Sequence, residues 1–141
     1  MKPAVALSLW TLYVWSTRIR NAWGDDDLSA GAAWAATALS ASFIAFAGAT
    51  LAWAWTTRRT GFPPCTRYLL VPFAVWTTAV WAVRGVDIAL GDHDVAFVVV
   101  HVALGVISAA LAWWAVSRLP GGRDERTGDG ALSPRETSTT G

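Results

Sequence analysis

The stretch from Leu28 to Thr57, LSAGAAWAATALSASFIAFAGATLAWAWTT, decides the fold of this chain. It contains no charged residue and exceeds the roughly 20 apolar residues that a helix needs to cross the hydrocarbon core of a bilayer. The whole chain of 141 residues is 54% hydrophobic and only 15% charged, whereas about a quarter of the residues in a soluble domain are charged. We therefore expect a transmembrane helix here, and the lipid bilayer as its surroundings.

A shorter apolar run, from Ala4 to Asn21, precedes this stretch. Arg18 and Arg20 lie at its far end, where their long side chains can reach the lipid headgroups. We do not expect a cleavable signal peptide, because the arginines follow the apolar core directly and no small-residue cleavage site comes after them. This run is the first expected transmembrane helix.

Two further apolar runs follow in the second half of the chain. One begins near Tyr68 and continues to Leu90, and the other extends from Val95 to Ser117. The segment before the first of them contains three residues that exclude a continuous helix: Gly61, Pro63 and Pro64.

These runs predict an all-α membrane protein of four transmembrane helices, arranged as two tandem helical hairpins of parallel orientation. The first hairpin covers residues 1–57, the connecting loop residues 58–67 and the second hairpin residues 68–118. Residues 119–141 are rich in Gly, Arg, Asp, Ser and Thr without apolar periodicity, so we expect a disordered tail.

The distribution of basic residues predicts the orientation, because Lys and Arg accumulate on the cytoplasmic side. Three basic residues lie on the side of the two hairpin loops: Arg18, Arg20 and Arg84. The opposite side, with both termini and the connecting loop, has eight: Lys2, Arg58, Arg59, Arg67, Arg118, Arg123, Arg126 and Arg135. We therefore expect the N- and C-termini and residues 58–67 to be cytoplasmic.

An internal repeat relates the two hairpins. One motif occurs twice at a spacing of 66 residues, as Trp10-Thr11-x3-Trp15-x2-Arg18 and as Trp76-Thr77-x3-Trp81-x2-Arg84. Two helices per copy means that both copies cross the membrane in the same direction, related by an axis along the membrane normal.

Two short patterns resemble a family of small, uncharacterised actinobacterial membrane proteins built as one hairpin. They are Trp15-x2-Arg18-x2-Asn21-x-Trp23-x-Asp25 and Ala96-Phe97-x3-His101-x2-Leu104-x3-Ser108. The chain resembles two such hairpins in tandem, over roughly residues 5–117. It departs from the family in that Arg-x2-Asn-x-Trp occurs only in the first hairpin and Phe-x3-His only in the second. The resemblance implies a location in a bacterial plasma membrane, and that family has no established activity.

The repeated motif contains the main candidate site. Thr11, Trp15 and Arg18 lie on one helical stripe, and Thr77, Trp81 and Arg84 repeat it. Two such stripes that face each other would line an outward-opening pocket, whose indoles and guanidinium groups suit a lipid headgroup or a small organic anion. The alternative is that the tryptophans anchor the helices at the interface and the arginines extend to the headgroups, and we favour this simpler interpretation.

His101 is the second candidate, because an ionisable residue within a membrane span is often functional. It shares a helix face with Gly105, Ser108 and Ala112, whose small side chains favour packing against a neighbouring helix. The imidazole is then expected to point into the protein, either as a hydrogen-bonded structural residue or as part of a site. A single buried histidine cannot provide both axial ligands of a haem.

The hairpin loops are acidic, which makes Asp92, His93 and Asp94 weak candidates for a metal site. A simpler interpretation is that Asp27 and Asp94 cap the second and fourth helices. Arg84 and Asp87 are spaced for an ion pair within one helix.

No catalytic motif is present, and both glutamates lie in the tail, so we predict neither an enzyme nor a cofactor. A single cysteine, Cys65, excludes an intrachain disulfide, and a net charge of +1 gives no reason to expect nucleic-acid binding. We favour a non-catalytic accessory, scaffold or assembly protein that forms a homo-oligomer or binds a membrane protein. Its binding faces would be Ala32-x3-Ala36-x3-Ser40 and Ala41-x3-Ala45-x3-Ala49. The alternatives are a ligand-binding or transport protein that uses the Trp/Arg/His101 pocket and, less favoured, a haem-binding redox protein.

Overall fold

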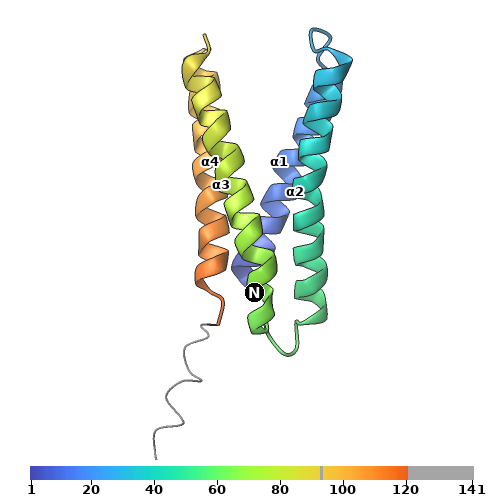
Figure 1. Cartoon of the computed structure of the whole chain (residues 1–141), viewed down its shortest axis with the longest axis vertical. Coiled ribbons are helices and arrows are strands. Elements are labelled where there is room, and N and C mark those ends of the chain that lie inside the picture. The colour runs from blue at the N-terminus through green and yellow to red at the C-terminus, as the bar shows by residue number, and fades with distance from the viewer. Residues whose placement is uncertain (93, 121–141) are drawn as a thin grey trace, which may run out of the picture.

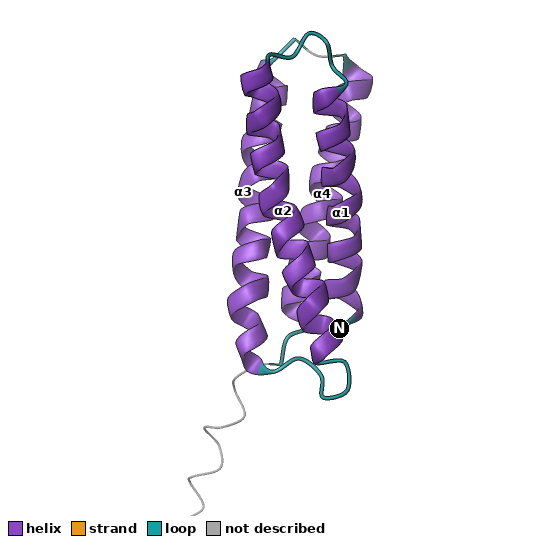
Figure 2. Cartoon of the chain, turned by 90° about the vertical axis from the view of Figure 1, so that its right-hand side faces the viewer, coloured by secondary structure: helices purple, strands orange, loops and turns teal. Residues whose placement is uncertain are grey.

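The computed structural model describes residues 1–92 and 94–120, and this part of the chain is entirely helical apart from its loops. Figure 2 shows the loops confined to the two ends of the molecule. The elements in chain order are α1 (Lys2–Trp23), α2 (Ala30–Thr56), the short 3₁₀ helix η1 (Pro64–Thr66), α3 (Arg67–Leu90) and α4 (Val95–Ser117). The expected disordered tail falls almost wholly outside the described residues.

Three of the helices are long and apolar enough to cross a membrane. They are α2, α3 together with η1, and α4. The first helix, α1, has 22 residues, but Lys2, Arg18 and Arg20 make it less apolar, and it is not one of the three. The prediction of an all-helical chain is therefore confirmed for the described residues, and three of its helices have the length and apolarity that crossing a membrane requires.

The helices pair in chain order, and the two pairs diverge. α1 packs along α2, and α3 packs along α4; α1 also contacts α4, whereas α2 and α3 contact each other much less. Figure 1 shows the pairs closest at the end with the N-terminus and the α2–α3 connection, and furthest apart at the end with the α1–α2 and α3–α4 loops. We call these the closed end and the open end.

Local sequence explains where the helices begin. Asp94 is the N-cap of α4 and accepts a hydrogen bond from the backbone N–H of Ala96 at 3.2 Å, as predicted. The predicted cap at Asp27 is wrong, because Ser29 caps α2. Asp27 lies in the preceding turn, where its backbone N–H donates to Asp25.

The α2–α3 connection contains the predicted helix breakers. Gly61 has a φ of +80°, a conformation that glycine adopts without steric cost. Pro63 lies in extended backbone and Pro64 opens η1, where the missing proline N–H needs no partner. The chain therefore turns back before α3, as the sequence predicted.

The core lies towards the closed end. Leu7, Phe43, Leu70 and Phe73, one or two from each of three helices, are completely buried there. Large aromatic rings fill the space between the pairs, and the rings of Phe46 and Phe73 stack at 5.3 Å. This packing holds the closed end together and leaves the open end less filled.

Hydroxyl groups of serine and threonine satisfy the indole N–H groups of tryptophan. Five indoles in the described chain donate to a hydroxyl: Trp10 to Ser108, Trp23 to Thr37, Trp53 to Thr66, Trp76 to Ser42 and Trp113 to Thr78. The donor–acceptor distances are 2.9 to 3.1 Å. Each bond joins two elements, so tryptophan links the helices by polar as well as apolar contacts.

Candidate ligand-binding cleft

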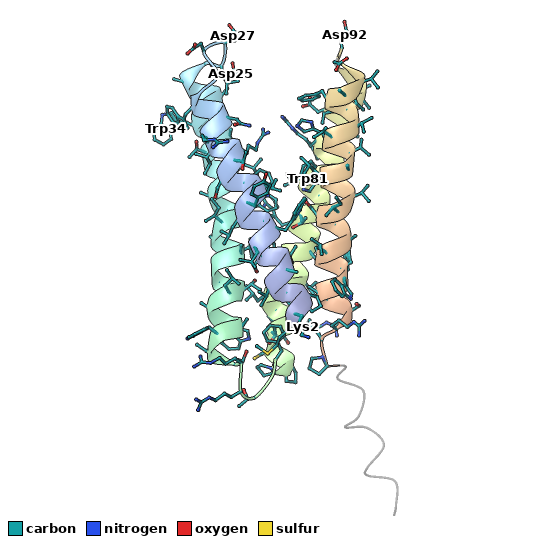
Figure 3. All side chains as sticks on the ribbon, turned by 180° about the vertical axis from the view of Figure 1, so that it is seen from behind. Lys2, Asp25, Asp27, Trp34, Trp81 and Asp92 are labelled. Atoms are coloured by element: carbon teal, nitrogen blue, oxygen red, sulfur yellow. The ribbon has the colours of Figure 1, made fainter. Side chains whose placement is uncertain are left out.

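A cleft of about 630 Å³ lies between the two helix pairs on the side of the open end. This volume is within the range of small-molecule sites in proteins. Its lining residues come from all four helices, and the aliphatic ones among them are Val14, Ala22, Leu28, Ala36, Leu39, Val80, Val100 and Leu104. Figure 3 shows Trp81 between the pairs, at the depth where they diverge.

Five of the predicted site residues line this cleft: Trp15, Arg18, Trp81, Arg84 and His101. The two predicted threonines do not. Thr11 and Thr77 are buried, and the Thr77 hydroxyl donates to the carbonyl oxygen of Phe73 at 2.8 Å within its own helix. The threonine end of each helical stripe therefore lies deeper than the cleft.

Aromatic rings border the deep part of the cleft. The Trp15 ring stacks on Phe43 with a centroid distance of 4.0 Å. It also contacts Trp81 of the other pair at 6.5 Å. Trp15 is only 5% exposed, so these rings separate the cleft from the core at the closed end.

The two arginines differ in their partners. The Arg84 guanidinium forms an ion pair with Asp87 at 3.6 Å, one turn along α3, as predicted. Arg18 has no carboxylate partner among the described residues. Its Cζ atom lies 6.0 Å from the Trp15 ring centroid, within reach of a cation–π interaction, and its Nε atom is buried without a hydrogen-bond partner.

Among the tryptophans of the described chain, Trp81 is the one whose indole nitrogen is both buried and without a hydrogen-bond partner. In this it contrasts with the five indoles that donate to hydroxyls. A buried donor without a partner costs about 1–3 kcal/mol. Arg18 Nε and Trp81 Nε1 are the two buried side-chain polar atoms without a partner in the described chain, and both residues line the same cleft.

His101 contacts its own helix and two cavities. Its Nδ1 atom lies 2.8 Å from the carbonyl oxygen of Phe97, and because a carbonyl only accepts, Nδ1 carries the proton. In the neutral ring Nε2 is then the acceptor. With Trp81, His101 also lines a smaller, apolar groove of about 280 Å³ on α3 and α4, so these two side chains form the wall between groove and cleft.

The small-residue face of α4 packs as expected. A Cβ atom on Gly105 would lie 3.0 Å from Cε3 of Trp81, so the glycine lets the indole approach the helix closely. Ser108 accepts the Trp10 hydrogen bond and Ala112 is completely buried. The helix face that carries His101 is therefore turned towards protein.

Several residues of the cleft were quoted only within the two family-like patterns. Asn21, Asp25, Phe97 and Leu104 all line it. The patterns lie on α1 and α4, which are far apart in the sequence but in contact in the fold. The position of Asn21 could have been found from helical spacing, because it follows Arg18 by one turn. No feature of the sequence indicated that Phe97 lines the same cleft.

Of the three weak candidates for a metal site, the structure describes only Asp92 and Asp94. No group of three His, Cys, Asp or Glu side chains able to hold a metal occurs in residues 1–92 and 94–120. Asp92 and Asp94 are exposed at the open end, and His93 lies outside the described residues. Asp94 is already used as a helix cap.

Comparison with known protein families, with curated proteins and with solved structures gives no match to this chain. Its function must therefore be argued from the cleft itself.

Proposed function

We propose that this chain is a membrane-embedded, non-catalytic ligand-binding protein whose site is the cleft between its two helix pairs. One observation carries the proposal: the two buried, unpartnered donors of the described chain, Arg18 Nε and Trp81 Nε1, both belong to residues that line this cleft. Natural proteins rarely bury such donors, and those they retain often serve a function. Because of these two donors, we favour the ligand-binding role over the accessory role.

We further propose that all four helices cross the membrane as two tandem hairpins of the same orientation, the product of a duplication. The cross-pair hydrogen bonds support this arrangement. Trp10 of α1 donates to Ser108 of α4, and Trp76 of α3 donates to Ser42 of α2. Both the donors and the acceptors are 66 residues apart, so each hairpin makes the same bond to the other, as a two-fold relationship requires.

In this arrangement the termini are cytoplasmic, and the protein belongs to a bacterial plasma membrane, as in the family that the two patterns resemble. Three basic residues at the open end against eight on the other side support the orientation. The cleft then opens towards the outer leaflet, where it is accessible to lipid-soluble compounds and to solutes outside the cell.

A bulky side chain in the cleft tests the binding role. Ala36 lines the cleft and Ala38 is exposed two residues along the same helix. We expect the protein extracted in a mild detergent to retain one small molecule in native mass spectrometry, and Ala36→Trp to abolish this retention while Ala38→Trp preserves it. A protein that carries no small molecule, or an Ala36→Trp variant that retains it equally well, would contradict the proposal.

An accessory role in an assembly is the second candidate, because one small-residue stripe remains unpacked. Ala41, Ala45 and Ala49 are exposed along α2, whereas Ser40 of the other stripe is buried and Ala36 lines the cleft. An exposed alanine stripe allows close approach of another helix. The same native mass spectra show a homo-oligomer or a bound protein directly. Ala45→Leu should disrupt this association. A monomer without a bound protein would contradict the accessory role.

A further inference from the structure

The chemistry of the cleft specifies the kind of ligand it accepts. Within the described chain, five indole N–H groups are paired with hydroxyls of this protein, and Trp81 is left with a buried donor and no acceptor. The Arg18 Nε–H is a second such donor on the facing helix pair. Both nitrogens are covered by neighbouring side chains, so a ligand pairs them only when these side chains shift, and it must supply acceptor atoms because neither group can accept.

The charge of the lining makes an anionic acceptor more favourable than a neutral one. Arg18 and Arg84 contribute two positive charges, and Asp25 contributes one negative charge. Asp25 already accepts a hydrogen bond from the backbone N–H of Asp27, and Arg84 is paired with Asp87. Of the two arginines that line the cleft, Arg18 is therefore the one without an ion pair to a carboxylate of the described chain, and a guanidinium binds oxyanions through two parallel N–H donors.

Apart from the charged side chains and Tyr13, Thr17, Asn21 and His101, the wall is apolar, and this apolar part indicates what is attached to the anion. Aliphatic side chains from all four helices line the cleft together with Arg18, and Trp15 and Trp81 border its deep part. A free, fully hydrated anion gains nothing from such a wall, whereas a hydrocarbon chain gains from each apolar contact. The polar and apolar surfaces together match an amphiphile.

We infer that the ligand is an anionic amphiphile, with an oxyanion headgroup such as a phosphate monoester held by Arg18 and Trp81 and a hydrocarbon chain along the aliphatic wall. Arg84 contributes the second positive charge. This inference rests on the proposed binding function and adds the chemical class of the ligand. A phosphate head can belong to a membrane lipid or to a soluble ester, so the test must separate these two sources.

Three related probes isolate head and chain. 1-Oleoyl lysophosphatidic acid has both, 1-monooleoylglycerol has the same chain without the phosphate, and glycerol 3-phosphate has the head without the chain. Each is titrated into the full-length protein in a neutral detergent, and native mass spectrometry counts the bound molecules. We expect lysophosphatidic acid to bind with a stoichiometry of one, and the other two probes to bind at least about tenfold more weakly.

Two variants and one control identify the donors. Arg18→Gln should weaken binding of lysophosphatidic acid about tenfold or more, and Trp81→Phe, which keeps the ring but removes the N–H, should weaken it several-fold. Arg20→Gln is the matched control, because Arg20 is an exposed arginine on the same helix that does not line the cleft. Circular dichroism establishes that each variant is folded.

The possible outcomes separate the two proposals. Equal binding of monooleoylglycerol and lysophosphatidic acid, with no effect of Arg18→Gln, overturns the anionic headgroup but leaves the ligand-binding function intact. Binding of glycerol 3-phosphate as tight as that of lysophosphatidic acid overturns the amphiphile in favour of a soluble anion. If no probe binds and Ala36→Trp also changes nothing in the native protein, both the ligand class and the proposed function are wrong.

Discussion

The indole N–H of Trp10 donates to the hydroxyl of Ser108 over 2.9 Å, which joins the first helix of the chain to the last. α1 and α4 make the more extensive of the two contacts between the helix pairs, and this bond is part of it. The corresponding bond from Trp76 to Ser42 is 3.1 Å long and joins α3 to α2, two helices that otherwise contact each other little.

Removal of the acceptor should therefore destabilise the bundle. Ser108→Ala leaves the Trp10 N–H without a partner and is expected to lower the free energy of unfolding by about 1–3 kcal/mol. Trp10→Phe in the same background removes the unpaired donor, so the double variant should lose less than the sum of the two single variants. Denaturant unfolding in detergent micelles measures both, with the exposed Ser16→Ala as the control; additive losses would show that the bond contributes little.

Gly105 should tolerate no larger residue, because Trp81 occupies the space of its missing side chain. Gly105→Leu is expected to displace the indole and destabilise the protein by about 1–3 kcal/mol. Gly85 has no atom within 4 Å of the equivalent Cβ position, so Gly85→Ala should leave the melting temperature unchanged or raise it. Equal melting temperatures for Gly105→Leu and the parent protein would contradict this packing.

The helix caps give a prediction that separates neighbouring residues. Ser29→Ala removes the acceptor for the Ala32 N–H, which lies 3.3 Å away, and should cost about 1 kcal/mol. Asp27→Ala removes no cap of α2 and should have a smaller effect. Hydrogen exchange at the first turn of α2 is the direct measurement; faster exchange in Asp27→Ala than in Ser29→Ala would reverse the assignment.

The proposed orientation can be tested with the natural cysteine. Cys65 is exposed and lies at the closed end, so a membrane-impermeant maleimide should label it only after the cells are permeabilised. A Cys65→Ser variant with Asp26→Cys, at the open end, should be labelled in intact cells. The opposite pattern would invert the topology and place the opening of the cleft on the cytoplasmic side.

Much of this architecture could be predicted from the sequence, because helix length and hydropathy are local properties. The uncharged run from Leu28 to Thr57 and the breakers around Pro63 were sufficient to place helices and connections. The facing of Trp15 and Trp81 could also be anticipated, since a repeated motif on two parallel helices tends to present equivalent faces.

The depth and shape of the cleft could not be predicted in the same way. They depend on how far the two pairs diverge, which large rings such as Phe43 and Phe73 determine through contacts between distant parts of the chain. The position of Thr11 shows the difference: the pattern gave its helix face, but only the packing of Trp15 shows that it lies below the cleft. The cap at Ser29 instead of Asp27 depends on where the preceding turn ends, which the spacing of polar residues left open.

The contrasting surroundings of Trp15 and Trp81 have a consequence for recognition. Trp15 is covered by a flat aromatic ring, whereas Trp81 lies against a glycine and beside an imidazole. A symmetric dimer of identical hairpins would offer a ligand two equivalent binding poses. The two walls of this cleft differ in the same way, so the ligand that we propose would meet two unlike surfaces and should bind in one orientation relative to the protein.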